Sequence, residues 1–285
     1  MPWAYEHRYW LYAWIPIFGS FIWFFTLWAM LITWLATGRP KYVHEQGSIA
    51  LISDIGASYL KPLFIACCSI TGASFFLTLV TERWLRHSGR LIPNMRRREK
   101  VFSILAIIGS FIGGGGLIML SIFDVRRFHS VHDSMLVVFI VGVGLSAIFI
   151  IIEYRWLSKN YAEERKLKTA YIIKGVIAGT LIILAIIFAI TLWVASNVGA
   201  VFEWVIAFGY TFYLLSFYFD LRMSRGVRKG ELHPLAAQRT GVPMQQVNGN
   251  NVNQPYTNGH TNGHGNGGVY GYAANGPAAN MSERV

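Results

Sequence analysis

The sequence is short of charge and of cysteine, and both shortages narrow the kind of protein it can encode. Only 14% of its 285 residues are charged, while 54% are hydrophobic; soluble domains carry about 25% charged residues. A chain of this composition is not expected to fold in water around a single core. Its two cysteines, Cys67 and Cys68, are adjacent in an apolar run, which excludes a disulfide framework and a zinc-ligand spacing.

The sequence also lacks the short motifs that mark common enzyme classes. It contains no hydrolase nucleophile elbow, no phosphate-binding loop, no dinucleotide fingerprint between a strand and a helix, and no His-Glu-x-x-His. The four glycines at 113–116 lie inside an apolar segment without the Lys-Ser/Thr pair of a phosphate loop. We therefore assign no catalytic residue, no metal and no cofactor, and we favour a protein that is not an enzyme.

What the chain does contain is six long apolar segments, each near the roughly 20 residues that a transmembrane helix needs. They lie at residues 11–36, 62–81, 101–123, 134–152, 170–194 and 200–221. The first is too long for a signal-peptide core and no small-residue cleavage site follows it, so we interpret it as a retained anchor. The pattern predicts an all-α, polytopic membrane protein: a six-helix transmembrane bundle between an N-terminus at 1–10 and a tail from residue 222.

The distribution of basic residues predicts the orientation of this bundle. Twenty of the 25 Lys and Arg residues fall on the side that holds both termini, and five fall on the other side. Because cytosolic loops are enriched in Lys and Arg, both termini are expected in the cytosol. The acidic residues divide nine to five, which leaves the whole net charge of +11 on the cytosolic side.

Two charged residues inside the spans are interpreted as interfacial. Lys174 is close enough to the start of the fifth span for its side chain to reach the membrane surface. Asp220 lies beside Arg222 at the end of the sixth span, where water is within reach.

The tail changes character at about residue 231. It becomes rich in Asn, Gly, His, Gln and Pro, and such a composition cannot bury enough apolar surface to offset the entropy of ordering. We predict disorder from about residue 231, and we interpret His260 and His264 as part of this low-complexity tract rather than as metal ligands.

Basic clusters adjoin the spans on the predicted cytosolic side. They consist of Arg96, Arg97, Arg98 and Lys100 before the third span, and Arg165, Lys166 and Lys168 before the fifth. Juxtamembrane clusters attract anionic lipids at about 1 kcal/mol per basic residue, although they also serve to set topology. The expected partners are membrane lipids, with phosphoinositides and a lipid-kinase complex as candidates. We expect no nucleic-acid partner.

The opposite side carries a compact set of acidic and histidine residues. The set comprises Asp54, Asp124, His129, His132, Asp133 and Glu203. His129 and His132 share a face if their segment is helical. Metal binding, acid–base chemistry on a lipid and hydrogen bonding to a lipid head group remain open, beside a purely structural network that ties the loops together.

The glycines of the third span favour close helix packing. Gly109, Gly113 and Gly116 fall on one helical face, and small residues on one face let two helices approach closely in a membrane. The alternative is a broken helix that lines a substrate path, as in transporters.

Several of these residues belong to motifs that together resemble a known family. The motifs are Ile52-Ser53-Asp54-Ile55-Gly56, Glu82-Arg83-Trp84-Leu85, Phe123-Asp124 through His129 to His132-Asp133, Glu153-Tyr154-Arg155, and Glu203-Trp204 with Tyr213-Leu214-Leu215-Ser216-Phe217. On these motifs the chain resembles the DRAM/FRAG/SFK family, whose domain also forms the N-terminal part of the CWH cell-wall proteins. The resemblance covers about residues 10–224, and the Asn-rich tail is similar to that of fungal SFK members. One departure is Leu60-Lys61-Pro62, where many animal members have a Pro-Glu pair, so no role of that acid is carried over.

The resemblance implies six spans with cytosolic ends and a function in membrane lipids. Family functions include phosphoinositide-kinase organisation, phospholipid asymmetry, autophagy and lipid remodelling of GPI anchors. We predict a non-enzymatic regulator of lipid organisation at the plasma membrane, with an endomembrane or the vacuole as alternatives. An outer-face enzyme or accessory factor for GPI or other lipid remodelling is the first functional alternative. A channel or transporter is the second, and the few charges within the spans count against it.

Overall fold

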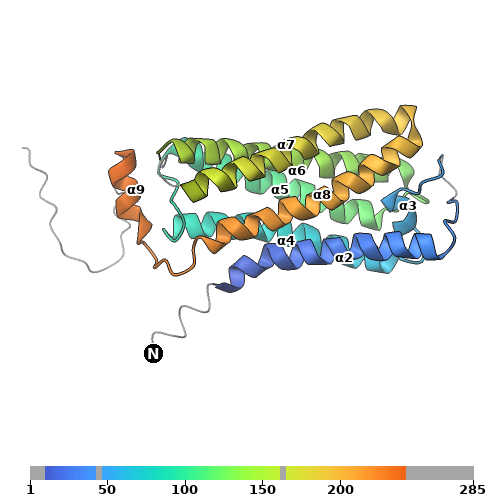
Figure 1. The fold of residues 1–285 in the computed structure, drawn as a ribbon, viewed down its shortest axis with the longest axis horizontal. Coiled ribbons are helices and arrows are strands. Elements are labelled where there is room, and N and C mark those ends of the chain that lie inside the picture. Colours follow the sequence, from blue (N-terminus) through green and yellow to red (C-terminus); the bar gives the residue numbers. More distant parts are fainter. Residues whose placement is uncertain (1–9, 43–46, 161–164, 242–285) are drawn as a thin grey trace, which may run out of the picture. The chain divides into compact units, whose positions relative to one another are not determined.

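Six long helices form the body of the protein. The computed structural model describes residues 10–42, 47–160 and 165–241. The long helices are α2 (Trp14–Ala36), α4 (Lys61–His87), α5 (Arg97–Ile122), α6 (His129–Asn160), α7 (Arg165–Val194) and α8 (Ser196–Arg222). The shorter ones are η1 (Trp10–Ala13), α3 (Ile52–Gly56) and α9 (Leu232–Thr240). The long helices run side by side along a common axis (Figure 1).

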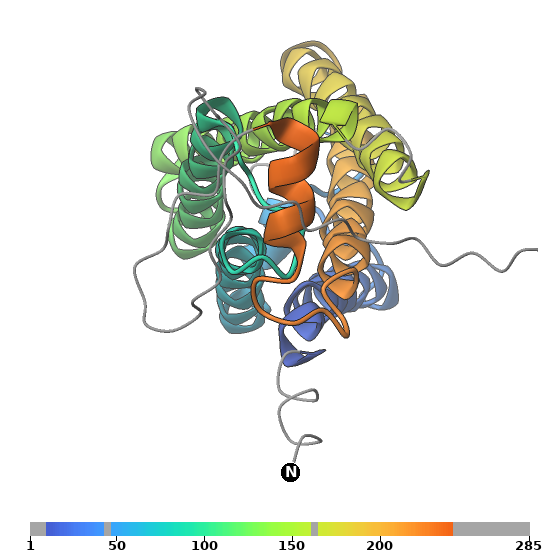
Figure 2. The ribbon, with the colours of Figure 1, turned by 90° about the vertical axis from the view of Figure 1, so that its left-hand side faces the viewer.

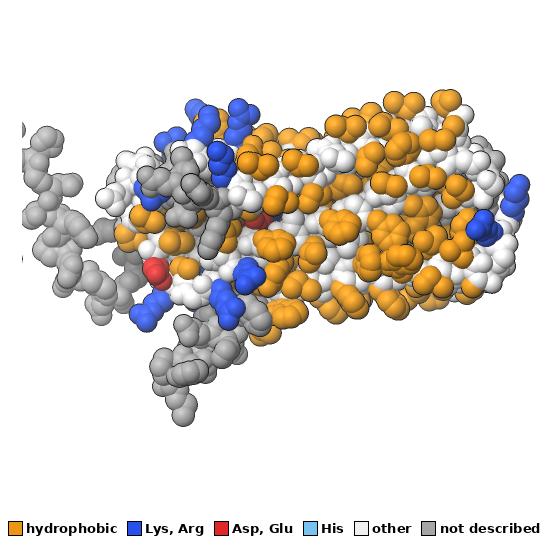
Figure 3. All heavy atoms as spheres, viewed as in Figure 1, with side chains coloured by type: hydrophobic (Ala, Val, Ile, Leu, Met, Phe, Trp, Pro, Cys, Tyr) orange, Lys and Arg blue, Asp and Glu red, His pale blue; other side chains and the backbone are white. Residues whose placement is uncertain are grey.

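The outer surface of this bundle is apolar along its flanks. Within the described residues, all six long helices have the length and hydropathy of membrane spans, with mean hydropathies of 1.6 to 3.0. Large side chains such as Phe21 on α2 and Ile183 on α7 are more than half exposed, and Figure 3 shows hydrophobic side chains covering the flank between charged ends. Soluble monomers rarely expose apolar patches beyond a few hundred Å². The chain is an integral membrane protein, and the prediction of a six-helix transmembrane bundle is confirmed.

The two ends of the bundle differ in charge. The basic end is where α2, α5 and α7 begin and where α4, α6 and α8 end, and it carries Arg96–Lys100, Arg155, Lys168 and Arg222. The α3 end is the opposite one, named for the short helix at Ile52–Gly56. Figure 2 looks onto the basic end, with α9 lying across it.

Helix α9 corrects one prediction. Residues 232–240 were predicted to be disordered, but they form a helix that packs against the end of α4. The backbone N–H of Leu232 donates to the carbonyl of Gly89 at 3.2 Å, that of Gly230 donates to the carbonyl of Ser88 at 2.9 Å, and Ala236 is fully buried. The prediction of disorder from residue 231 was wrong here because these tertiary contacts stabilise a segment that is polar on average. Residues 242–285, including His260 and His264, lie outside the described residues.

Aromatic side chains join α2, α4 and α8 at the centre of the bundle. The ring of Phe75 on α4 meets the rings of Tyr210, Tyr213 and Phe217 edge-on, with centroids 6.0 to 6.2 Å apart. Trp23 on α2 donates its indole N–H to the carbonyl of Ala207 on α8 at 2.8 Å. Edge-to-face pairs add to the free energy of burial, so these three helices form a packed core.

Glycines set the distance between α5 and α6. A Cβ added at Gly113 would lie 2.7 Å from the backbone N of Val143, and one at Gly116 would lie 2.7 Å from the backbone N of Phe139. At Gly109 the distance to the backbone N of Ser146 would be 2.9 Å. The glycine face therefore packs directly on the backbone of α6, and this is the most extensive helix contact in the bundle. By comparison, α6 and α7 share a much smaller contact.

Candidate functional site

A carboxylate on α8 holds the short helix α3 in place. Glu203 accepts a hydrogen bond at 3.0 Å from the backbone N–H of Ile52, the first residue of α3. A carboxylate at a helix N-terminus satisfies N–H groups that otherwise lack partners. Asp54, on the same short helix, is buried as well and lies two residues after Ile52, whose N–H Glu203 accepts. The predicted cluster residues Asp54 and Glu203 are thus brought together from segments about 150 residues apart.

His132 is buried at the same end of the bundle, with one ring nitrogen committed to the backbone. Its Nδ1 is 2.9 Å from the carbonyl oxygens of both Leu120 and Phe123. Because a carbonyl can only accept, Nδ1 carries the hydrogen, and in the neutral imidazole Nε2 is left as an acceptor. The side chain is only 3% exposed, so the geometry fixes both the position and the tautomer of this ring.

The other three residues of the predicted cluster lie apart from this group. Asp124 forms an ion pair with Lys61 at the start of α4 and accepts the backbone N–H of Arg127 at 2.9 Å. His129 and Asp133 pair with each other at 2.9 Å on the exposed first turn of α6. Within the described residues, no three His, Cys, Asp or Glu side chains are grouped closely enough to hold a metal ion. The six residues therefore comprise three buried side chains at the α3 end, a loop-to-helix tether and a surface pair.

The tether between Lys61 and Asp124 predicts an acid-sensitive contribution to stability. Burial alone raises the pKa of Asp124, but the hydrogen bonds from Lys61 and from the N–H of Arg127 outweigh it and hold the pKa below its usual value of 3.8. A carboxyl group whose pKa falls on folding stabilises the folded state above its unfolded pKa, and this stabilisation is lost as the pH falls through the lower folded pKa. Asp124→Asn should lower the melting temperature of the detergent-solubilised protein at neutral pH. At pH values below the usual pKa of Asp, the difference in melting temperature between this variant and wild type should become smaller. A difference that stays constant into that acidic range would contradict the tether.

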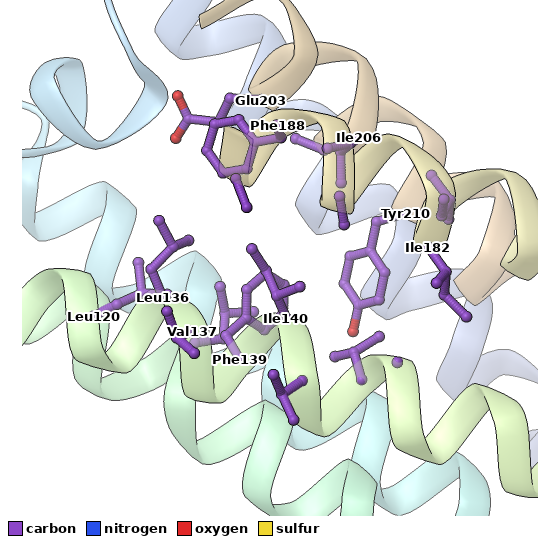
Figure 4. Close-up of a pocket in the computed structure, with 18 of the residues that line it drawn as sticks. Leu120, Leu136, Val137, Phe139, Ile140, Ile182, Phe188, Glu203, Ile206 and Tyr210 are labelled. Atoms are coloured by element: carbon purple, nitrogen blue, oxygen red, sulfur yellow. The ribbon is translucent and has the colours of Figure 1, made fainter. Parts of the chain in front are cut away.

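An apolar cavity extends inward from Glu203 and His132. Its volume is about 440 Å³, and it lies between α6, α7 and α8 (Figure 4). Leu136, Val137 and Ile140 line one wall from α6, and Ile182 and Phe188 line the other from α7. Tyr210 stands between α8 and α6, and its buried hydroxyl has no hydrogen-bond partner within the described residues.

A second buried polar site lies toward the basic end of the bundle. Arg86 donates to Glu82 at 2.8 Å on the same helix and lies 3.6 Å from Glu153 on α6. Tyr154 donates its hydroxyl to Glu82 at 2.8 Å, and Asn94 donates its amide to Glu153 at 2.7 Å. All five residues are at most 6% exposed. This network joins α4 and α6 with the segment that leads into α5.

An ion pair between α7 and α8 lies beside this network and corrects two predictions. Lys174 pairs with Asp220 and its Nζ lies 3.6 Å from the ring centroid of Phe217. Both charged side chains are at most 3% exposed. The predictions that Lys174 reaches the interface and that Asp220 is an interfacial charge were wrong, because each residue is buried against its counter-ion on the neighbouring helix.

The sequence did not predict that these buried charged residues pair with one another, although each of them is visible in it. Glu82, Glu153, Lys174 and Asp220 each lie within the spans or just past an apolar segment's end, where a single charge is ordinarily explained by access to water. The overlooked signal is that four helices carry an ionisable residue near the same end, with both signs present. Ionisable residues in membrane spans usually pair with one another.

The basic end presents the predicted basic cluster as an exposed surface. Arg96, Arg97 and Arg98 surround a concavity of about 310 Å³ beside Trp156 of α6. The guanidinium of Arg98 lies 5.6 Å from the Trp156 ring centroid, and the Nζ of Lys159 lies 4.9 Å from it. Lys100 and Lys168 are exposed as well, whereas the side chains of Arg165 and Lys166 lie outside the described residues.

Comparison with known proteins identifies the family. Residues 11–224 match the family described as Frag1/DRAM/Sfk1/Cwh43P N-terminal domain, and this range contains the helices α2 to α8. The chain belongs to the Frag1/DRAM/Sfk1 family. The resemblance inferred from the motifs is thereby confirmed.

Two yeast members of the Frag1/DRAM/Sfk1 family are similar to this chain. Protein SFK1 of Saccharomyces cerevisiae is 30% identical over 191 residues, which is 57% of this chain and 54% of that protein. Protein sfk1 of Schizosaccharomyces pombe is 30% identical over 216 residues, which is 75% of this chain and 65% of that protein. The chain thus spans a little over half to about two thirds of the length of these relatives. No solved structure matches the chain.

Proposed function

We propose that this member of the Frag1/DRAM/Sfk1 family is a non-enzymatic regulator of membrane lipid organisation that binds anionic lipid head groups at the cytosolic face of the plasma membrane. The observation that carries the proposal is the concavity at the basic end, where Arg96, Arg97 and Arg98 are all exposed beside Trp156. Glu99 is the acidic residue in the lining, and guanidinium groups are the side chains that pair in a bidentate way with phosphate oxygens. An indole at this level is typical of a residue at the membrane interface.

The charge distribution of the whole chain also favours the basic end as the lipid-binding face. The net charge of +11 falls entirely on the side that holds the basic end, and the enrichment of Lys and Arg in cytosolic loops supports a cytosolic position for that side. The cytosolic leaflet is the one rich in anionic lipids. A lipid-kinase complex that acts on phosphoinositides would find its substrate concentrated there, so such a complex is the partner that we propose.

The proposal predicts that neutralising the three arginines weakens phosphoinositide binding. At about 1 kcal/mol per basic residue near the surface, the triple variant Arg96→Gln, Arg97→Gln and Arg98→Gln should bind about 100-fold more weakly, since every 1.4 kcal/mol is about tenfold. The measurement is titration of purified protein with dioctanoyl phosphatidylinositol phosphate at low ionic strength. Binding by wild type should weaken when salt is added.

A matched variant separates local binding from the loss of positive charge alone. Arg126 and Arg127 are exposed at the α3 end, so Arg126→Gln with Arg127→Gln lowers the net charge without touching the basic end. This control should bind within a factor of a few of wild type. Unchanged affinity in the triple variant, together with unchanged co-purification of lipid-kinase activity, would show that the basic end is not the binding surface.

A further inference from the structure

The apolar cavity opens toward the flank of the bundle. Val137, Val141 and Leu145 on α6 line the cavity, and so does Ile186 on α7. The same four side chains are 44 to 59% exposed on the apolar surface. A side chain that both lines a cavity and lies on the flank marks its mouth, so the mouth lies between α6 and α7, where the helix contact is small. In a membrane this mouth faces lipid, which is therefore the molecule with direct access.

The end of the cavity near α3 offers hydrogen-bond acceptors. The carboxylate of Glu203 lines it, and so does the ring of His132, whose Nδ1 is already committed to two carbonyl groups. The hydroxyl of Tyr210, which also lines the cavity, is buried and has no hydrogen-bond partner within the described residues. A buried polar atom without a partner is uncommon in native proteins and is accounted for when an occupant forms a hydrogen bond with it.

Charge further restricts the occupant. Among the described residues that line the cavity there is no Lys or Arg, and Glu203 is the charged residue. Asp54 adds a second buried acidic side chain on α3. A phosphate or carboxylate head group would meet acidic side chains without a cation to offset its own charge, whereas a hydroxyl or an amine can donate to their oxygens.

We propose that the cavity between α6, α7 and α8 binds a lipid whose head group is a hydroxyl or an amine and carries no phosphate or carboxylate. The lipid enters sideways between α6 and α7. Its chain lies against Leu136, Ile140 and Ile182, and its head group donates to Glu203 and His132. This site is distinct from the basic end in both position and ligand, so it stands independently of the proposed function.

Photo-labelling of the full chain tests the proposal. The protein is purified, placed in phosphatidylcholine nanodiscs and irradiated with hexadecyl probes that carry a diazirine and an alkyne and end in a hydroxyl, an amine or a carboxylate. The hydroxyl or the amine probe should label peptides of α6 and α7 several-fold more than the carboxylate probe does. Glu203→Gln keeps an oxygen that can accept the N–H of Ile52 but removes the charge, so it should reduce labelling by the amine probe and spare labelling by the hydroxyl probe.

Two glycines provide a matched pair of variants. Gly144 lines the cavity, Gly179 on α7 does not, and both have open space where a Cβ would stand. Gly144→Leu fills the cavity and should lose most of the labelling, while Gly179→Leu should label like wild type. The variant with Arg96, Arg97 and Arg98 neutralised should also label like wild type, which separates this test from that of the basic end.

Two results overturn the proposal: equal labelling by the carboxylate probe, or unchanged labelling in Gly144→Leu. If Gly144→Leu does not purify as a monodisperse protein, labelling of the wild type in the presence of unlabelled competitors tests the proposal instead. Excess unlabelled hexadecanol or hexadecylamine should then suppress labelling, and excess palmitate should not. Suppression by palmitate to the same extent contradicts the site as described.

Discussion

Replacing Arg86 with methionine should destabilise the bundle by about 3–5 kcal/mol, the cost typical of removing one partner from a buried ion pair. Arg86 is 3% exposed and lies between the carboxylates of Glu82 and Glu153, at 2.8 and 3.6 Å. Without it, two buried carboxylates face each other with no cation between them. The expected result is a sharp drop in melting temperature and in the yield of monodisperse protein, measured by size exclusion after heating.

A neighbouring arginine gives the control. Arg155 lies next to the network residue Tyr154 in sequence, but its side chain is exposed, so Arg155→Met should change stability by no more than about 0.5 kcal/mol. Arg86→Lys should be intermediate, because lysine keeps the charge but loses the two-point contact with Glu82. Equal melting temperatures for Arg86→Met and Arg155→Met would mean that the network does not stabilise the fold.

Replacing Gly113 with valine should separate α5 from α6. A Cβ at this position would lie 2.7 Å from the backbone N of Val143 and 2.9 Å from its Cγ2, and the backbone of a helix cannot yield as a flexible side chain does. Overpacking of this kind costs about 1–3 kcal/mol, and occasionally more. The measurement is again the melting temperature in detergent.

Gly115 isolates the contact from the change in helix propensity. It lies on the same helix, and no atom stands within 4 Å of the Cβ that a substitution would add. Gly115→Val carries the same change in intrinsic propensity but should leave the α5–α6 contact intact. If Gly113→Val and Gly115→Val have the same melting temperature, close glycine packing does not stabilise the contact between α5 and α6.

The spans followed from the sequence because their signal is local. Twenty consecutive apolar residues must cross or avoid the membrane as a unit, so hydropathy alone located α2 and α4 to α8. Helix ends were less predictable: α6 runs from His129 to Asn160, well past its apolar segment, because polar turns at the membrane surface continue the helix. Helix α9 was missed because its stability comes from contacts with Ser88 and Gly89, which lie far from it in sequence.

The sites were less predictable because they depend on which helices are neighbours. The sequence placed Asp54, His132 and Glu203 at one end of the bundle. It did not show that Glu203 would cap α3 or that Asp124 would pair with Lys61. The cavity arises from the small contact between α6 and α7, and no short motif encodes such a gap. Lys174 and Asp220 were misread because their pairing is visible only when α7 and α8 are side by side.

The buried ion pairs also bear on how the chain enters the membrane during synthesis. A lone charge in a spanning helix opposes insertion by as much as about 2.5–3.5 kcal/mol at the helix centre. Helix α4 carries both Glu82 and Arg86, four residues apart, so this buried pair is matched within one segment. Helix α7 has Lys174, whose counter-ion Asp220 arrives only with α8, and Ala195 alone lies between the two helices. We therefore expect α4 to integrate on its own and α7 to wait for α8, so that the last two helices enter the bilayer together as a hairpin.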